Sequence, residues 1–212
     1  KRLSERMKKF SKKLQYEKAL KIRNQIEALS VVVDQGRLSP VLVSDLKELK
    51  DILSLRHIPA RIEAFDISNI HGHGAVGSMV TFFNGEPLKS QYRRFRIKTV
   101  AEIDDYAMIK EVVKRRYLRL IKEKKNLPDL ILIDGGKGHL RCALDELKSL
   151  GLKIPIISIA KKPERIFVKE EKNPIQLSTR SKAFKLIQKI RDEAHRFAIS
   201  YHRIVRKKAV FK

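Results

Sequence analysis

Acidic residues, cysteine and tryptophan are scarce in this chain. Its 212 residues include 24 Asp and Glu against 48 Lys and Arg, a single cysteine and no tryptophan. The lone Cys142 cannot form a disulfide within the chain, which is typical of a reducing compartment such as the cytoplasm. The net charge of +24 disfavours self-association and favours a polyanionic partner, with nucleic acid as the leading class. Charge alone does not separate an enzyme from a basic binding protein.

Long apolar runs are also missing. Nowhere do about 18 apolar residues follow one another, so we expect no helix that spans a membrane. The first residues, Lys1–Glu5, do not have the pattern of a signal peptide. The chain lacks an initiating Met and stops at Lys212 without a recognisable end. We therefore expect a fragment of a longer protein.

Apolar residues recur at helical spacing near the start of the chain. They are Leu3, Met7, Phe10, Leu14, Ala19, Ile22, Ile26 and Leu29. This spacing predicts two short helices, within residues 1–33, that pair as an antiparallel hairpin and keep an apolar face for a partner. A cap packed on the main domain is the alternative. Residues 34–60 are predicted to be a connector that contains a short helix, Ser44–Leu53. Extended segments are predicted at Val31–Val33, just before the connector, and at Val41–Val43 within it.

Strand patterns dominate from residue 61 to the end of the chain at 212, where we predict the main domain. Ile62–Ser68, Ala75–Phe83 and Lys89–Ile97 are typical of strands, and Asn84-Gly85 predicts a hairpin turn. The later elements are predicted to be helices at Asp104–Lys125, Gly138–Leu150 and Ala183–Ala198, strands at Leu130–Asp134 and Ile154–Ala160, and a hairpin of Arg165–Lys169 with Pro174–Leu177. An antiparallel meander followed by parallel αβ units is the order of the ribonuclease H-like α/β fold, a mixed sheet flanked by helices.

Two of these strands carry an acid that an apolar strand does not need. Asp66 lies within the apolar run Arg61–Ser68, and Asp134 ends the run Leu130–Asp134 just before two glycines. In the expected fold the two strands are neighbours, so the carboxylates lie side by side and repel each other. A divalent cation relieves that repulsion. His195, on the last helix, can complete a set of hard oxygen and imidazole ligands.

Other motifs are weaker. The loop after Asp134 lacks the glycine spacing and the Ser or Thr of a phosphate-binding Walker loop. His71 and His73 have no nearby Cys or carboxylate that would make them a metal pair. His139 is close enough to Asp134 in sequence to line the site, and His202 follows the last predicted helix, but neither receives a firm role.

Several segments together resemble the C-terminal half of the UvrC family, the incision subunit of bacterial nucleotide excision repair. They are RIEAFDIS (Arg61–Ser68), YRRF (Tyr92–Phe95), DDY (Asp104–Tyr106), LPDLILIDGGKG (Leu127–Gly138) and IRDEAHRFA (Ile190–Ala198). Residues 1–33 resemble the UVR motif through which that family engages UvrB. The family's GIY-YIG nuclease domain and helix-hairpin-helix pair are not among these segments.

The resemblance implies an endonuclease that cuts damaged double-stranded DNA on the 5′ side of a lesion, with Mg²⁺ or Mn²⁺, no small-molecule cofactor and no membrane. It places catalytic residues at Asp66, Asp134 and His195, which are also the metal ligands, with Asp105 as a supporting acid. Arg93, Arg94, Lys137 and Arg196 are candidates for DNA contacts. The expected UvrB-binding residues are Phe10, Leu14, Tyr16, Ala19, Ile22, Arg23 and Ile26. His139 and Tyr16 stand where the family usually has Gln and Phe.

The role of His195 and two alternative functions stay open at this point. His195 is either a metal ligand or a general acid and base. A ribonuclease H that acts on RNA–DNA hybrids is a second enzymatic reading, although that family normally uses four acids and no histidine at this place. The third reading is a scaffold that binds DNA and UvrB and has only structural acids.

Overall fold

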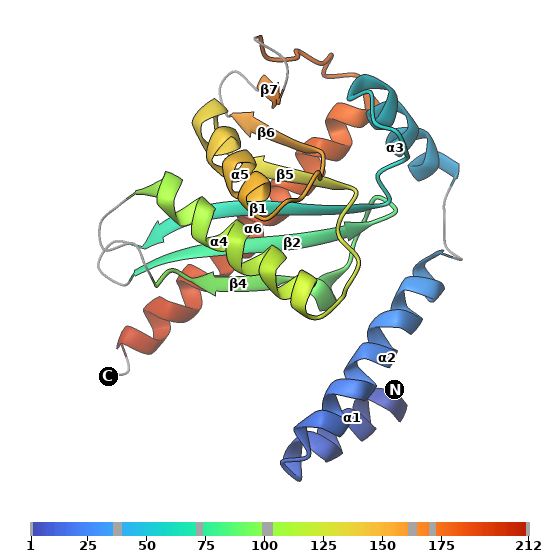
Figure 1. The fold of residues 1–212 in the computed structure, drawn as a ribbon, viewed down its shortest axis with the longest axis vertical. Coiled ribbons are helices and arrows are strands. Elements are labelled where there is room, and N and C mark those ends of the chain that lie inside the picture. Colours follow the sequence, from blue (N-terminus) through green and yellow to red (C-terminus); the bar gives the residue numbers. More distant parts are fainter. Residues whose placement is uncertain are drawn as a thin grey trace. The chain divides into compact units, whose positions relative to one another are not determined.

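A computed structural model describes residues 2–35, 40–70, 74–98, 104–160, 165–169 and 173–210. The chain divides into two compact units, Lys1–Leu42 and Val43–Lys212. In the first unit, α1 (Arg2–Lys12) and α2 (Tyr16–Gln35) pack against each other as a hairpin (Figure 1). Helix α1 ends because Leu14 takes a left-handed conformation (φ 57°), which lets the Gln15 N–H donate to the Phe10 carbonyl at 3.0 Å. The predicted two-helix hairpin is confirmed.

The predicted extended segments between the two units are wrong. Val31–Val33 belongs to α2, and Val41–Val43 belongs to α3 (Pro40–Ile52). The helical preference of valine is only a few tenths of a kcal/mol below that of better helix formers, so a helix that has already nucleated continues through a valine run. Proline in the first helical position has no N–H to leave unpaired, which favours a helix that begins at Pro40.

The second unit is built on one mixed sheet of seven strands. They are β1 (Arg61–Ile70), β2 (Gly74–Phe83), β3 (Glu86–Pro87), β4 (Arg93–Arg96), β5 (Leu130–Asp134), β6 (Ile156–Ala160) and β7 (Arg165–Val168). The strand order is β3-β2-β1-β5-β6-β7. Strand β4 also pairs with β2, along a different part of β2 from β3. The β1–β2 and β6–β7 pairs are antiparallel, whereas β1–β5 and β5–β6 are parallel. The predicted order of strands and helices is confirmed.

Turn chemistry explains the first edge of this sheet. Asn84 (φ 53°) and Gly85 (φ 80°) both take the positive φ that a tight two-residue hairpin turn needs. The hairpin is confirmed, but β3 is short because Pro87 has no N–H for a longer ladder. The predicted strand at 89–97 begins instead with a 3-10 turn, η1 (Lys89–Gln91), and becomes extended only in β4. The late hairpin reduces to β7 and an isolated bridge between Ile166 and Ile175.

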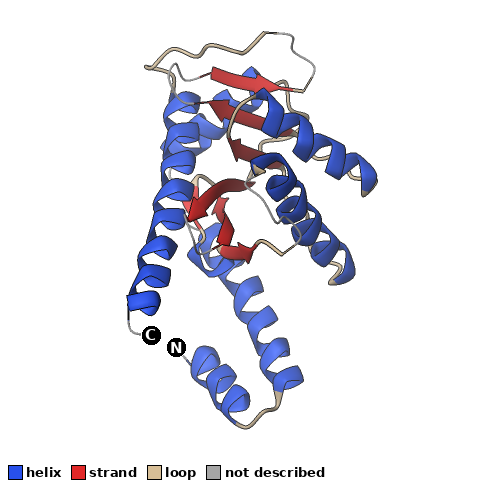
Figure 2. Ribbon diagram, turned by 90° about the vertical axis from the view of Figure 1, so that its left-hand side faces the viewer, coloured by secondary structure: helices blue, strands red, loops and turns tan. Residues whose placement is uncertain are grey.

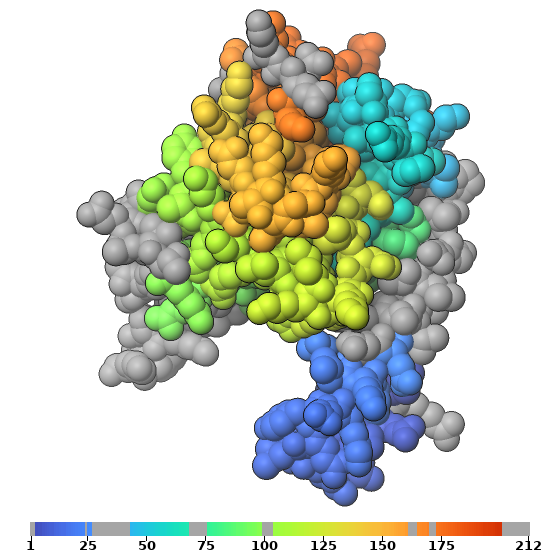
Figure 3. All heavy atoms as spheres, in the orientation of Figure 1, coloured from blue at the N-terminus to red at the C-terminus, as the bar shows by residue number. Residues whose placement is uncertain are grey.

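Helices cover both faces of the sheet. Helices α4 (Asp105–Lys122) and α5 (Lys137–Ser149) pack on one face, and α3 and α6 (Lys182–Val210) pack on the other (Figures 1 and 2). The space-filling view shows the side chains of α4 and α5 over their face (Figure 3). Close contact is built in at Gly77, where a Cβ would lie 2.5 Å from a Val112 methyl group. None of the described helices has an apolar stretch long enough to span a bilayer.

A buried ion pair ties the start of β1 to α4. The Glu63 carboxylate is fully buried and accepts hydrogen bonds from Arg116 Nε at 3.1 Å and from Arg116 Nη2 at 2.6 Å. The Tyr117 hydroxyl donates to the same carboxylate at 3.3 Å, and Arg61 Nη2 donates at 3.2 Å. Glu63 therefore sits between two guanidinium groups inside the core under α4.

Candidate active site

Two carboxylates meet at the carboxyl ends of β1 and β5. The last backbone pair of these parallel strands is Phe65 with Ile133, so the next residues along the two strands are Asp66 and Asp134. In each strand the residues two and four positions earlier belong to the core cluster under α3 and α6. Because strand side chains alternate between faces, both carboxylates point to the α6 side of the sheet. The topology thus brings together two acids that are far apart in sequence.

A histidine from α6 completes the cluster. His195 Nδ1 lies 3.0 Å from Asp66 Oδ2, and the His195 side chain is 49% exposed whereas that of Asp66 is 8% exposed. One ligand atom from each of Asp66, Asp134 and His195 lies within 4.8 Å of the others. The site is therefore closed on the sheet side and open to solvent at the histidine.

These three residues fit a divalent cation. Carboxylate oxygens with one imidazole nitrogen are a donor set that suits Mg²⁺ or Mn²⁺. Two ligands at right angles and about 2.1 Å from one ion lie about 3.0 Å apart, which matches the 3.0 Å between His195 and Asp66. The same distance suits a hydrogen bond, so the spacing is compatible with His195 as a ligand and as a proton-transfer group.

The glycine turn after Asp134 is held to β6. The Gly135 N–H donates to the Ile159 carbonyl at 2.9 Å, and the Ser158 hydroxyl donates to the Gly136 carbonyl at 3.3 Å. Gly136 is the N-cap of α5. These bonds fix the direction in which the chain leaves Asp134, so the carboxylate is carried by a braced turn. Asp134 is not merely a turn residue, because it closes the ladder of β5 with Ile159 of β6.

Asp105 lies apart from the three clustered residues. It is exposed and is the first residue of α4, next to the N-cap Asp104. The group of potential ligands found among the described residues does not include Asp105. A supporting role for this acid stays a prediction.

The four predicted DNA contacts lie on β4, α5 and α6. Arg94 of β4 stacks on the Phe197 ring of α6 at 4.3 Å, and Arg196 Nε of α6 donates to Glu193 at 2.6 Å. Lys137 is exposed at the start of α5, beside the glycine turn. Arg93, in contrast, folds back onto the backbone carbonyl of Tyr92 at 2.8 Å.

Tyr92, just before β4, is clamped to α6 by contacts that the sequence did not predict. The Tyr92 hydroxyl donates to Glu193 Oε1 at 2.9 Å, and the Tyr92 and Phe197 rings meet edge to face at 5.0 Å. Burial and the Glu193 carboxylate raise the pKa of Tyr92 far above its usual range, so the hydroxyl stays protonated and donates. The Arg196 guanidinium and then the Tyr92 hydroxyl hold the pKa of Glu193 below its usual value. The spacing of Glu193 and Arg196 indicates their own ion pair on one helix, but no local pattern indicates the contact with Tyr92.

In the first unit the predicted partner-binding residues differ in exposure. Leu14 is 71% exposed and Tyr16 is 63% exposed at the turn of the hairpin, whereas Ile22 is 7% exposed. The remaining four, Phe10, Ala19, Arg23 and Ile26, are partly buried. Leu14 and Tyr16 therefore offer accessible apolar surface, and Ile22 mainly packs the hairpin together.

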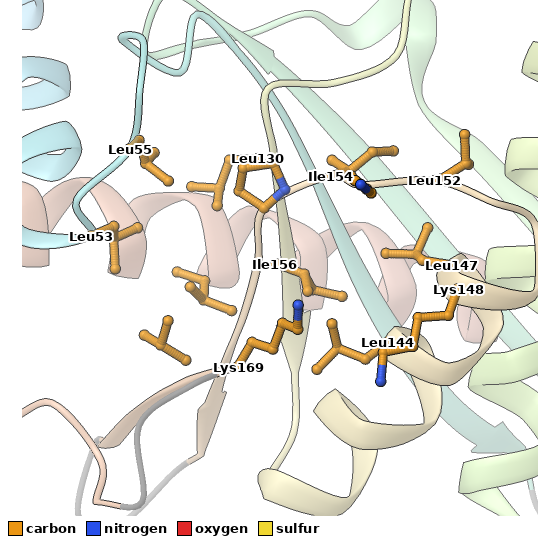
Figure 4. Close-up of a pocket in the computed structure, with 14 residues that line it drawn as sticks. Leu53, Leu55, Leu130, Leu144, Leu147, Lys148, Leu152, Ile154, Ile156 and Lys169 are labelled. Atoms are coloured by element: carbon orange, nitrogen blue, oxygen red, sulfur yellow. The ribbon is translucent and has the colours of Figure 1, made fainter.

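An apolar hollow lies at the other end of the sheet. Its volume is about 500 Å³, and it is lined by aliphatic residues around Leu130, Leu147 and Ile156, with Lys148, Lys153 and Lys169 as its charged lining residues (Figure 4). Leu130 begins β5, whereas Asp134 ends it. None of the described residues that line the hollow carries a carboxylate, so these residues include none of the groups from which the candidate site is built.

Of the remaining histidines, His57 is exposed in the loop between α3 and β1, and His139 is close to the candidate site. It lies in the first turn of α5 near Gly135. His71 and His73 fall outside the described residues, and so does the side chain of His202.

Comparison with known proteins identifies the family. A family model described as the UvrC RNAse H endonuclease domain matches residues 50–199, and one described as the UvrB/uvrC motif matches residues 1–31. The chain belongs to the UvrC family. The expected ribonuclease H-like fold is thereby confirmed, since the matched domain covers the mixed sheet and its flanking helices.

Curated relatives of the UvrC family carry the name UvrABC system protein C. The one from Methanosarcina mazei is 53% identical over 167 residues, which cover 79% of this chain and 32% of that protein. The one from Dehalococcoides mccartyi is 49% identical over 177 residues, which cover 81% of this chain and 29% of that protein. The chain thus spans about a third of the length of these relatives. Among solved structures, endonuclease V of Ciona intestinalis in complex with DNA is 22% identical, with a TM-score of 0.37 and 60% of each chain covered.

Proposed function

We propose that the second unit is a metal-dependent DNA endonuclease that makes the 5′ incision beside a lesion, and that the first unit recruits it to UvrB. The observation that carries the proposal is the convergence of Asp66, Asp134 and His195 at one edge of the sheet. Membership of the UvrC family supports the assignment to nucleotide excision repair within the UvrABC system. A basic protein with one cysteine suits a cytoplasmic partner of DNA.

The three clustered residues have distinct tasks in this proposal. Asp66 and Asp134 would hold a Mg²⁺ or Mn²⁺ ion, and His195 would be either its third ligand or the proton-transfer group. When bound, the ion would lower the pKa of a water molecule and offset charge on the phosphate under attack. Asp66 also orients the imidazole through the 3.0 Å contact with Nδ1. In the proton-transfer role of His195, Nε2 would be the ring nitrogen that exchanges a proton with the reacting oxygens. The partial exposure of His195 leaves room for the DNA backbone on that side.

Cations on both sides of the cluster suit a DNA strand that passes across it. Lys137 stands at the glycine turn, and Arg94 and Arg196 stand along α6. Arg94 is pre-oriented by its stacking on Phe197 and by a 2.8 Å hydrogen bond to Ser200. A guanidinium fixed in this way loses little rotational freedom when it binds a phosphate. We assign these three side chains to phosphate contacts that position the strand without reading its sequence.

Recruitment is assigned to the turn of the first hairpin. Leu14 and Tyr16 are exposed apolar side chains next to each other at that turn, and apolar anchors of this kind carry much of the energy of a protein interface. The UvrB/uvrC motif covers them. Tyr16→Ala should therefore weaken binding to UvrB while leaving divalent-ion binding by the second unit unchanged.

The decisive experiment measures incision of a lesion-bearing duplex that carries a pre-made 3′ nick and is loaded with UvrB. Wild type should cut on the 5′ side in Mg²⁺ and not in EDTA. Asp134→Asn, which removes one charge with almost no change in volume, should abolish cutting and keep DNA binding. Asp145→Asn is the matched control, because Asp145 is an exposed acid of α5 outside the cluster, and it should cut like wild type.

Other outcomes point to the other readings. UvrB-independent cutting of an RNA–DNA hybrid in preference to the lesion duplex would indicate a ribonuclease H. DNA and UvrB binding with no divalent-ion binding, and no cutting by wild type, would indicate a scaffold. Cutting by Asp134→Asn at the wild-type rate would refute the assignment of the site.

A further inference from the structure

Tyr106 is an exposed aromatic residue whose ring packs closely over a glycine. It lies in the first turn of α4 and is 49% exposed. A Cβ built on Gly138 would meet Tyr106 Cε1, Oη and Cζ at 2.7–2.8 Å. Because real Cβ atoms do not approach so closely, this position of the ring requires glycine at the start of α5. The ring is thus packed on one side and open to solvent on the other.

The backbone under the ring is fixed as well. The Asp104 carboxylate caps α4 by accepting from the Tyr106 N–H at 2.9 Å and from the Ala107 N–H at 3.0 Å. A capped first turn does not fray as an uncapped one does. Tyr106 therefore emerges from a rigid helix end.

A second ring connects Tyr106 to the candidate active site. The centroids of the Tyr106 and His139 rings lie 4.9 Å apart, and the ring planes are inclined by 52°. His139 in turn covers Gly135, where a Cβ would lie 2.7 Å from His139 Cγ. Gly135 directly follows Asp134. The exposed Tyr106 ring is thus connected to Asp134 through His139 and Gly135.

We propose that Tyr106, braced by His139, is a stacking surface for an unpaired nucleobase of the strand that is cut. The inference rests on the proposed function, in which DNA crosses the carboxyl ends of β1 and β5. An aromatic ring with one open face stacks on any base, because every base has a π-face. The close fit of the ring over Gly138 and against His139 limits its movement, and a stacking surface has to be rigid to hold a base in place.

The neighbouring charge agrees with this assignment. Lys137 is exposed between Gly136 and Gly138, at the same turn of the chain as the ring contacts. A base stacked on Tyr106 therefore has a cation at hand for the backbone phosphate of its own strand. Such a contact would order the strand beside the candidate site without selecting its sequence.

The test is photochemical crosslinking to the full chain in EDTA, where no cutting takes place. The probe is a duplex with a short single-stranded gap that contains 5-iodouracil, a base that crosslinks to aromatic side chains stacked on it. Wild type should crosslink at Tyr106, as mapped by mass spectrometry. Tyr106→Phe keeps the ring and should still crosslink, whereas Tyr106→Leu should not. Tyr106→Leu should also bind the gapped duplex about 5- to 100-fold more weakly, the range expected for one stacked base.

Two further variants separate stacking from other effects. Ile121→Ala removes another exposed apolar side chain of α4 and should change neither the crosslink nor the affinity. Gly138→Ala should displace the Tyr106 ring and reduce crosslinking even though the tyrosine is present. Equal affinity and an unchanged crosslink pattern in Tyr106→Leu would overturn the proposal. Asp134→Asn should crosslink like wild type, so the loss of cutting and the loss of stacking are distinguishable.

Discussion

Removal of the buried carboxylate of Glu63 should destabilise the second unit strongly. Glu63 is fully buried and lies between the guanidinium groups of Arg116 and Arg61. Glu63→Ala leaves Arg116, whose side chain is 7% exposed, as a buried charge without its counter-ion. Breaking a buried ion pair from one side typically costs about 3–5 kcal/mol. For a unit of this size that loss lowers the melting temperature by about 6–20 °C.

Variants of Glu63 and Arg116 should differ in stability according to whether a buried charge is left unpaired. Most of the cost comes from the buried charge that is left behind, so Glu63→Leu combined with Arg116→Met should be more stable than Glu63→Ala alone. Glu123→Ala is the matched control, because Glu123 pairs with Arg119 on the exposed side of the same helix. An exposed pair contributes about 0–1 kcal/mol. Urea unfolding followed by circular dichroism measures all of these variants.

The same carboxylate should make stability depend on pH in the acid range. Burial raises the pKa of Glu63, but the hydrogen bonds and charge of Arg116, with the charge of Arg61, outweigh burial and hold the pKa below its usual value. A depressed folded-state pKa contributes stability above the unfolded value of about 4.3, and this stability is lost as the pH falls through the folded-state pKa. Glu63→Gln should flatten that part of the pH profile. This account would be refuted if Glu63→Ala lost under about 1 kcal/mol of unfolding free energy. It would also be refuted if Glu63→Leu with Arg116→Met were less stable than Glu63→Ala.

Three further predictions follow from single contacts. Gly77→Ala should cost about 1–3 kcal/mol by overpacking against α4. Gly136→Ala has nothing within 4 Å of its Cβ and should lose only the preference for glycine at the N-cap, which is under about 1 kcal/mol; equal losses would contradict this. Asp104→Ala should remove the N-cap of α4 and cost about 1 kcal/mol in urea unfolding, with Asp104→Asn largely restoring it. Mn²⁺ at 100 times its dissociation constant should stabilise wild type by about 2.7 kcal/mol but should not stabilise Asp134→Asn. An equal rise in melting temperature for both proteins would show that Asp134 is not a ligand.

The fold and the position of the two acids were open to prediction because they depend on local pattern. An apolar strand with one acid, a buried strand that ends in an acid, and an Asn-Gly turn are each visible in the sequence. Together with the order of elements they predict which strands are neighbours, and the parallel pairing of β1 with β5 follows. The length of α2 was missed because a weak local preference of valine yields to helix continuation.

Partners across the fold were not open to prediction from the residues alone. Glu63 and Arg116 are 53 positions apart, and Tyr92 and Glu193 are 101 positions apart. Each pair forms only because strand register and helix rotation place two side chains together, and neither quantity is written in the local sequence. The contact of Tyr106 with Gly138 is of the same kind. A glycine in a turn motif does not reveal which ring will cover it.

The β1–β5 ladder also affects how the protein acquires its activity. Asp66 and Asp134 become neighbours only after a loop of more than sixty residues, from β2 through α4, has closed between them. Contacts of such long range are intrinsically slow to form during folding. His195 arrives later still in the chain, on the final helix. A chain that ended before α6 would lack His195 and therefore the complete Asp66, Asp134 and His195 cluster.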